Sequence, residues 1–97
     1  MLNCKSLLYS DHAVKAMVSR FIRSYEVEDV INNGEIIKHY NTDKPYPSYL
    51  LLKFVNSRPL HVVLAQNPEC NECIIVTCYQ PDPKIWTKDF KSKIDLL

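Results

Sequence analysis

The spacing of apolar residues changes once along this chain, at its single glycine, Gly34. Before Gly34, apolar side chains recur every three or four residues, as in the stripe formed by Val14, Met17, Val18 and Phe21. A period near 3.6 residues predicts amphipathic helices, whereas the alternation that follows Gly34 predicts β-strands. A chain with helices first and strands afterwards is expected to fold as an α+β domain, because each layer must bury its apolar face against the other.

Two helices are predicted before Gly34, and capping residues define their ends. Ser10 can act as the N-cap of a helix that begins at Asp11, whose carboxylate complements the positive end of the helix dipole. Ser24 can cap a second helix, which Asn33-Gly34 ends because glycine readily adopts the left-handed conformation that follows a helix. The sequence therefore predicts an antiparallel or crossed pair of helices joined near residues 23–24.

Four strands and a short final helix are predicted after Gly34. The strands cover residues 35–40, 48–55, 60–65 and 73–79, and the short loops between them indicate antiparallel neighbours. Asp82 can cap a last helix with Pro83 at its first position, which would bring Trp86 back onto the domain. The predicted fold is α+β, with two N-terminal helices packed on a four-stranded antiparallel sheet and a short C-terminal helix.

The 97 residues fit a single domain, residues 1–97, without a linker or an internal repeat. No apolar run approaches the roughly 20 residues of a membrane span, and residues 1–9 are too short and too polar for a secretory signal. We therefore expect a cytoplasmic protein without a membrane partner. The net charge of +1 argues against binding nucleic acid through bulk electrostatics, although it leaves room for a local basic patch.

Four cysteines raise the question of a metal or redox site. Cys70 and Cys73 have the Cys-x-x-Cys spacing of half a zinc site, but a structural zinc needs four ligands, usually two such pairs. Redox activity of this motif needs the pair at a helix N-terminus, and here it precedes a predicted strand. We expect reduced cysteines in a cytoplasmic chain, with Cys73 and Cys78 packed as small apolar residues, and neither a metal nor a cofactor.

Several motifs resemble a bacterial family of small domains, Domain of Unknown Function 4258, over roughly residues 9–93. Among them are His12-Ala13 in the first helix, Arg58-Pro59-Leu60-His61 on the third strand and Pro81-Asp82-Pro83 after the fourth. The resemblance implies a compact fold like that of the RelE and BrnT ribonuclease toxins, which also place two helices before a four-stranded antiparallel sheet. One departure is Ala16, where the family usually has a basic residue.

Histidine, arginine and tyrosine are residue types that a metal-independent ribonuclease uses, because a base, an acid and cations must act on the phosphodiester. The predicted catalytic residues are His12, Arg58, His61 and Tyr79. His12 or His61 would be the base, the arginine would clamp the phosphate, and the tyrosine would be the acid or an orienting donor. The predicted substrate-binding residues are Arg20, Arg23 and Tyr46.

Each of these residues also has a structural explanation. His12 can stabilise the start of its helix, and His61 can be a core histidine with satisfied ring nitrogens. Arg58 can fix its turn or pair with Asp43, and the two helix arginines can belong to a solvated face. Tyr79 can close a sheet edge, with its ring buried and its hydroxyl satisfied.

Two functions fit the sequence. The first is a toxin-like, metal-independent endoribonuclease of a toxin–antitoxin pair, with RNA as its substrate and an antitoxin protein, or a second copy in a homodimer, as its partner. The second is a non-catalytic protein-binding module that uses the proline-rich loop 41–47 and its neighbouring tyrosines. The histidine, arginine and tyrosine residues favour the first function, whereas the near-neutral charge and Ala16 favour the second.

Overall fold

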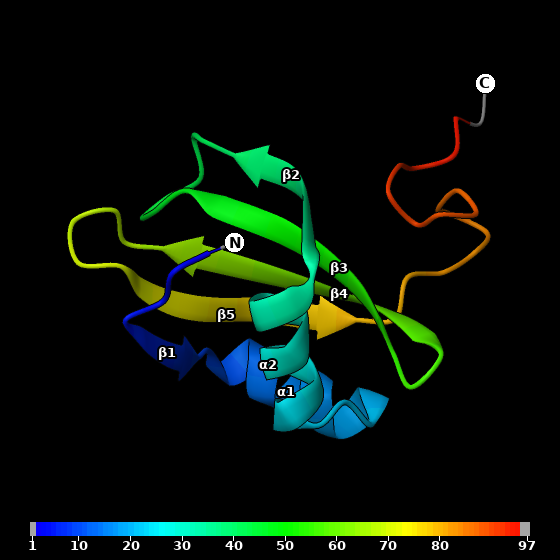
Figure 1. Cartoon of the computed structure of the whole chain (residues 1–97), viewed down its shortest axis with the longest axis horizontal. Helices are drawn as coiled ribbons and strands as arrows, with labels where there is room; N and C mark the ends of the chain where they lie inside the picture. The colour runs from blue at the N-terminus through cyan, green and yellow to red at the C-terminus, as the bar shows by residue number, and fades with distance from the viewer. Residues whose placement is uncertain (1, 96–97) are drawn as a thin grey trace.

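The computed structural model describes residues 2–95, which form a five-stranded sheet with two helices on one face (Figure 1). In chain order the elements are β1 (Ser6–Tyr9), α1 (Asp11–Arg20), α2 (Ser24–Asn33), β2 (Glu35–Tyr40), β3 (Ser48–Val55), β4 (Arg58–Gln66) and β5 (Glu72–Tyr79). The strands lie in the order β1-β5-β4-β3-β2. β1 runs parallel to β5, and the other neighbouring pairs are antiparallel.

The two helices lie where the spacing of apolar residues predicted them. The Ser10 hydroxyl accepts a hydrogen bond from the Ala13 amide at 3.0 Å, as expected for the N-cap of α1. Arg23, rather than Ser24, is the N-cap of α2, and its amide donates to the Glu26 carboxylate at 2.9 Å. Within residues 2–95 no helix has the length and apolar character needed to cross a membrane.

The prediction of a four-stranded antiparallel sheet is wrong, because β1 adds a fifth strand that is parallel to β5. Without β1, the backbone of Glu72–Ile75 would form an unpaired sheet edge. A disulfide between Cys4 and Cys73 ties the segment before β1 to β5, so the expected reduced state of these two cysteines is also wrong. The expected likeness to the RelE and BrnT toxins rested on a four-stranded antiparallel sheet. The observed sheet has five strands, one of them parallel, so this expectation is wrong together with the predicted sheet.

The predicted C-terminal helix is wrong as well. Among the described residues after β5, the chain forms turns and an isolated bridge between Trp86 and Lys93. A single turn forms where the Trp86 amide donates to the Asp82 carbonyl at 2.9 Å. The Asp89 carboxylate then accepts from the Thr87 hydroxyl at 2.7 Å, and such local side-chain hydrogen bonds compete with helix formation.

The main core lies between the two helices and one face of the sheet. α1 packs against β5, and α2 packs against β3 and β4. The buried side chains of this layer include Ala13, Val27, Val30, Leu51, Leu60, Val62, Leu64, Ile75 and Cys78. Because successive side chains of a strand point to opposite faces, the residues between these positions, such as Leu50 and His61, belong to the other face.

The other face of the sheet is free of helices among the described residues, and we call it the second face. It carries the register partners Leu50 and Val63 on β3 and β4, and His61 and Tyr79 on β4 and β5. The chain after β5 covers one end of this face, where the ring centroids of Trp86 and His61 lie 4.5 Å apart. In Figure 1 this segment, coloured orange to red, lies apart from the two helices.

Candidate functional site

A hollow of about 280 Å³ opens on the second face, where polar and aromatic side chains meet. Leu50 and Val63, which pair across β3 and β4, contribute its aliphatic part. Its other lining residues are Lys38, Tyr40, Tyr79, Trp86 and Lys93. This site combines two ammonium groups, two phenols and an indole, and we call it the tyrosine–lysine hollow.

Strand alternation explains why the residues from the sheet share one face. Lys38 and Tyr40 are two residues apart on β2, so their side chains point to the same side. Lys38 pairs with Leu50 of β3, which places both β2 residues on the second face. Tyr79 reaches the same face from β5 through its pairing with His61 of β4.

Trp86 and Lys93 reach the hollow from the irregular chain after β5. The isolated bridge between them holds the two backbones side by side. The Nζ atom of Lys93 lies 5.9 Å from the centroid of the Trp86 ring, which is within the range of a cation–π interaction. Trp86 is buried against His61, so this wall of the hollow is fixed to the sheet.

His61 and Tyr79 are the two predicted catalytic residues that the structure brings into direct contact. His61 is fully buried, and its Nε2 atom lies 2.8 Å from the Phe90 carbonyl oxygen. Because a carbonyl only accepts, Nε2 carries the proton and donates it. Burial lowers the pKa of His61, against the opposing effect of the Phe90 carbonyl, so the ring is neutral at neutral pH. Its Nδ1 atom therefore accepts a hydrogen bond from the Tyr79 hydroxyl at 3.2 Å.

Tyr79 lines the hollow, and its hydroxyl contacts His61 at 3.2 Å. Burial raises the pKa of Tyr79, and Tyr40 raises it further, so the phenol is neutral at neutral pH. Its proton points at Nδ1 of His61, which leaves the oxygen free to accept a hydrogen bond from a bound hydroxyl group. The pair can thus pass a proton from a ligand through Tyr79 to His61.

The two lysines of the hollow carry positive charge that no carboxylate neutralises in residues 2–95. Lys38 and Lys93 are exposed, and neither takes part in a salt bridge there. Lys91, by contrast, pairs with Glu35 at 3.1 Å. The described lining contains no acidic side chain, so the hollow has an unopposed attraction for anions.

His12 lies on α1 at the edge of β5, and it is not among the residues that line the tyrosine–lysine hollow. Its Nε2 atom lies 3.1 Å from the Thr77 hydroxyl oxygen, and His12 is exposed in the first turn of α1. Thr77 and Tyr79 alternate along β5, so they lie about 7 Å apart on one face. The structure therefore brings His12 to Thr77, and His12 makes no hydrogen bond to His61 or Tyr79 among the described residues.

Arg58 lies on the helix side of the sheet, away from the hollow. Its Nη2 atom donates to the Glu26 carboxylate at 3.0 Å and to the Phe21 carbonyl at 2.8 Å. Although burial raises the pKa of Glu26, hydrogen bonds from the Arg23 amide and from Arg58 bring it below its usual value. This ion pair holds the junction of α1 and α2 against β4.

The predicted substrate-binding residues are separated by the fold. Arg20 donates to the Cys78 carbonyl at 2.9 Å, and the Arg23 amide caps α2, so both lie on the helix side. Tyr46, in the loop between β2 and β3, lines another hollow on the second face together with Val63. Of the three, Tyr46 shares a face with His61 and Tyr79.

Four charged or aromatic residues of the tyrosine–lysine hollow were not predicted as site residues from the sequence, namely Lys38, Tyr40, Trp86 and Lys93. The alternation of Lys38 and Tyr40 on a predicted strand was a usable signal that they share a face. Lys93 gave no such signal, because an irregular segment carries it to the hollow. Trp86 was predicted to pack on the domain, but it was not assigned to a site.

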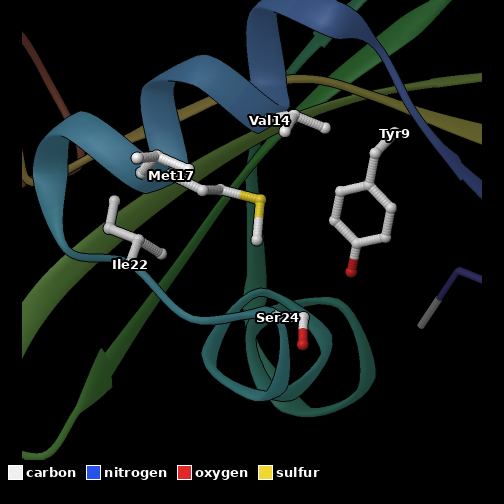
Figure 2. A pocket seen from close by; sticks show the side chains of 6 residues that line it. Tyr9, Val14, Met17, Ile22 and Ser24 are labelled. Atoms are coloured by element: carbon white, nitrogen blue, oxygen red, sulfur yellow. The ribbon is translucent and has the colours of Figure 1, made fainter.

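A larger hollow of about 380 Å³ lies between α1 and the start of α2 (Figure 2). It is lined by Tyr9, Val14, Met17, Val18, Ile22 and Ser24. Figure 2 shows the Met17 side chain reaching into the space between Ile22 and Tyr9. The Tyr9 hydroxyl is buried without a hydrogen-bond partner within residues 2–95, and burial raises its pKa. This lining suits an apolar contact better than acid–base chemistry.

The cysteines do not form a metal site in this structure. Cys73 is bonded to Cys4, so it is not a thiolate that could act together with the exposed Cys70. Within residues 2–95, no three histidine, cysteine, aspartate or glutamate side chains are grouped as metal ligands would be.

Comparison with known proteins places this chain in a family. The family model DUF4258, described as a domain of unknown function, matches residues 9–80. This range contains His61 and Tyr79 but ends before Trp86 and Lys93. Neither the curated proteins nor the solved structures give a match.

Proposed function

Because this chain belongs to the DUF4258 family, a domain of unknown function, we propose its function from the tyrosine–lysine hollow. We propose that the protein binds single-stranded RNA there and cleaves it without a metal, as a toxin-like endoribonuclease. The observation that carries this proposal is the hydrogen bond from Tyr79 to the buried, neutral His61 beside two unpaired lysines. The Coulomb attraction, the aromatic rings and the proton acceptor each match one part of an RNA strand.

Charge and stacking support RNA binding at the hollow. Lys38 and Lys93 attract the phosphate. Because the whole chain has a net charge of only +1, the attraction for RNA must come from such a local group of positive charges. Tyr40, which is 38 % exposed, offers a ring surface on which an unpaired base can stack, and such stacking contributes about 1–3 kcal/mol per base. A single strand fits these groups because its bases are not hidden in a duplex.

A path for one proton through Tyr79 to His61 supports cleavage. The 2′-hydroxyl of the bound nucleotide attacks the adjacent phosphorus and gives its proton to the Tyr79 oxygen, while the Tyr79 proton moves to Nδ1 of His61. The bond from phosphorus to the 5′-oxygen breaks, a 2′,3′-cyclic phosphate forms, and the 5′-oxygen takes a proton from solvent. The two lysines stabilise the negative charge that develops on the phosphoryl oxygens. His61 then returns its proton through Tyr79 to solvent, because burial disfavours the charged ring.

The test compares Tyr79→Phe with the parent protein on a labelled single-stranded RNA in the presence of a chelator. Removing the Tyr79 oxygen breaks the proton path but keeps the ring, so the cleavage rate should fall by about 10²–10⁴-fold while RNA binding stays within a factor of a few. Tyr25→Phe, on the exposed side of α2, is the matched control and should cleave like the parent. A parent protein without cleavage, or a Tyr79→Phe variant with full activity, refutes the ribonuclease proposal.

Protein binding is a second candidate function, favoured by an apolar surface on α1. Val14, Val18 and Phe21 are 48, 74 and 84 % exposed beside the hollow of Figure 2. Phe21 also has a left-handed backbone, with φ of 55°, which is unfavourable for an aromatic residue. An antitoxin protein that covers this surface with an apolar helix would leave the tyrosine–lysine hollow open, because the two surfaces lie on opposite sides of the sheet.

A photo-crosslinker placed at Val18 tests this second candidate in cells. A defined adduct that is lost when Phe21 is changed to serine supports a protein partner, and an adduct of twice the chain mass identifies the partner as a second copy. The same crosslinker at Lys84, which is exposed in the chain after β5 and lines none of the hollows described above, is the control. Equal adducts at both positions, or none at Val18, refute protein binding at this surface.

A further inference from the structure

A second hollow of about 270 Å³ adjoins the tyrosine–lysine hollow on the second face. Val63 lines both hollows, so they meet across this one side chain. The aliphatic part of the second hollow is formed by Val63, Ala65, Ile74 and Val76. The loop between β2 and β3 contributes Asp43, Lys44, Pro45 and Tyr46, and the first residue of β3, Ser48, adds a hydroxyl.

The loop that forms this wall is fixed to the sheet. The buried Ser48 hydroxyl donates to the Asp43 carboxylate, which joins the two ends of the loop. The Gln66 amide donates to the Pro47 carbonyl at 3.0 Å, which joins the loop to the end of β4. A wall that is already ordered loses little conformational entropy when a ligand binds. The second hollow is therefore preorganised.

The chemistry of the second hollow matches one nucleotide. Tyr46 is half-buried, so its ring is held in place while part of it remains accessible for stacking. Lys44 is exposed at the rim, within the same lining, and can approach a phosphate. Asp43 carries the negative charge of this wall, and its carboxylate accepts the hydrogen bond from the Ser48 hydroxyl. The aliphatic side chains of β4 and β5 form the remaining surface of the hollow.

We propose that the second hollow binds the nucleotide next to the one held at Tyr79, so that the protein recognises a dinucleotide step of single-stranded RNA. This inference rests on the RNA-binding function proposed above and names the substrate more closely. Tyr46 is then a specificity-determining residue, because its ring contacts the second base. A mononucleotide fills one hollow, whereas a dinucleotide fills both and joins them across Val63.

The experiment measures the affinity of uridine 3′-monophosphate and of the dinucleotide UpU, protected from cleavage by a 2′-O-methyl group, through the fluorescence of the single tryptophan, Trp86. UpU should bind more tightly than the mononucleotide. Tyr46→Ala should weaken UpU binding by about 5- to 100-fold, the range of one lost base–aromatic stack, and leave mononucleotide binding unchanged. Tyr46→Phe should retain tight binding because it keeps the ring.

Tyr25→Ala on α2 is the matched control, since it removes an exposed tyrosine from the opposite side of the sheet. Far-UV circular dichroism shows whether each variant keeps its secondary structure. If UpU and the mononucleotide bind equally, or if Tyr46→Ala weakens both alike, the second hollow is not a nucleotide subsite, while the RNA proposal stands. If neither compound binds the parent protein, the RNA proposal itself fails, and the subsite fails with it.

Discussion

Breaking the disulfide between Cys4 and Cys73 should destabilise the protein strongly. The two cysteines are 69 residues apart, so the bond closes a loop that contains most of the chain. In the chain-entropy model, a crosslink over a loop of this length stabilises the folded state by about 4 kcal/mol at 25 °C. This is a large share of the roughly 5–15 kcal/mol by which a typical domain is stable. We therefore expect Cys4→Ser to lower the free energy of unfolding by about 4 kcal/mol.

The fold offers little that would replace this bond. β1 has four residues, and Leu7 and Tyr9 are its residues that pack against the main core. Without the disulfide, this segment is held by the parallel pairing of β1 with β5, by these apolar contacts and by the hydrogen bond from the Gln66 side chain to the Asn3 carbonyl. The edge of β5 from Glu72 to Ile75 should then open more often, which hydrogen exchange of these amides would report.

Urea unfolding followed by Trp86 fluorescence measures the effect. Trp86 is the single tryptophan and is 6 % exposed, so its emission changes when the domain unfolds. Cys70→Ser, which removes an exposed free thiol, is the control and should unfold like the parent. Adding a reducing agent should destabilise the parent but not Cys4→Ser. Equal unfolding free energies for the parent and Cys4→Ser, with and without reductant, would show that the reasoning is wrong.

The ion pair gives two further predictions, and the buried histidine and the lysines give one each. Arg58→Ala should lower the free energy of unfolding by about 2–3 kcal/mol, because it leaves the Glu26 carboxylate buried without its cation. This loss is smaller than for a fully buried ion pair because the Arg58 side chain is 28 % exposed. A change below about 0.5 kcal/mol would contradict this expectation. Since the folded pKa of Glu26 is lowered, its contribution is complete above the unfolded pKa near 4.5 and should be lost as pH falls through the folded pKa. If His61 accepts the proton, the cleavage rate should fall on the acid side at a pH below 6.5, because burial lowers the pKa of His61. A fall in rate that begins above pH 6.5 would exclude His61 as the proton acceptor. Lys38→Ala and Lys93→Ala should each reduce the slope of log affinity for RNA against log salt by about one, whereas an unchanged slope would place the phosphate elsewhere.

Several features of the fold could be predicted because they depend on neighbours in sequence. Ser10 caps α1 through the Ala13 amide three residues away, and the glycine at position 34 marks the change from helix to strand. The alternation within β2 to β5 likewise shows in short stretches of sequence. β1 was missed because its partner lies at the far end of the chain, and the final segment because local side-chain bonds replaced a helix.

The candidate site likewise has features that the sequence indicated and features that depend on the tertiary structure. The sequence indicated His61 and Tyr79 as residues of a catalytic type on adjacent strands, and the register of β4 and β5 makes them partners. Arg58 is of an equally suitable type, but its strand position turns it to the helix side, where Glu26 binds it. Residue type is thus readable from the sequence, whereas the direction of a side chain depends on pairing.

The sequence by itself determined the two helices, the strands β2 to β5 and the residue types from which a site can be made, because capping and periodicity act over a few residues. The tertiary structure alone decided that β1 joins β5, that Cys4 and Cys73 are bonded, and that Lys38 and Lys93 meet at Tyr79. The physical reason is that such contacts join distant segments, whose encounter depends on the packing of the whole chain rather than on any local preference.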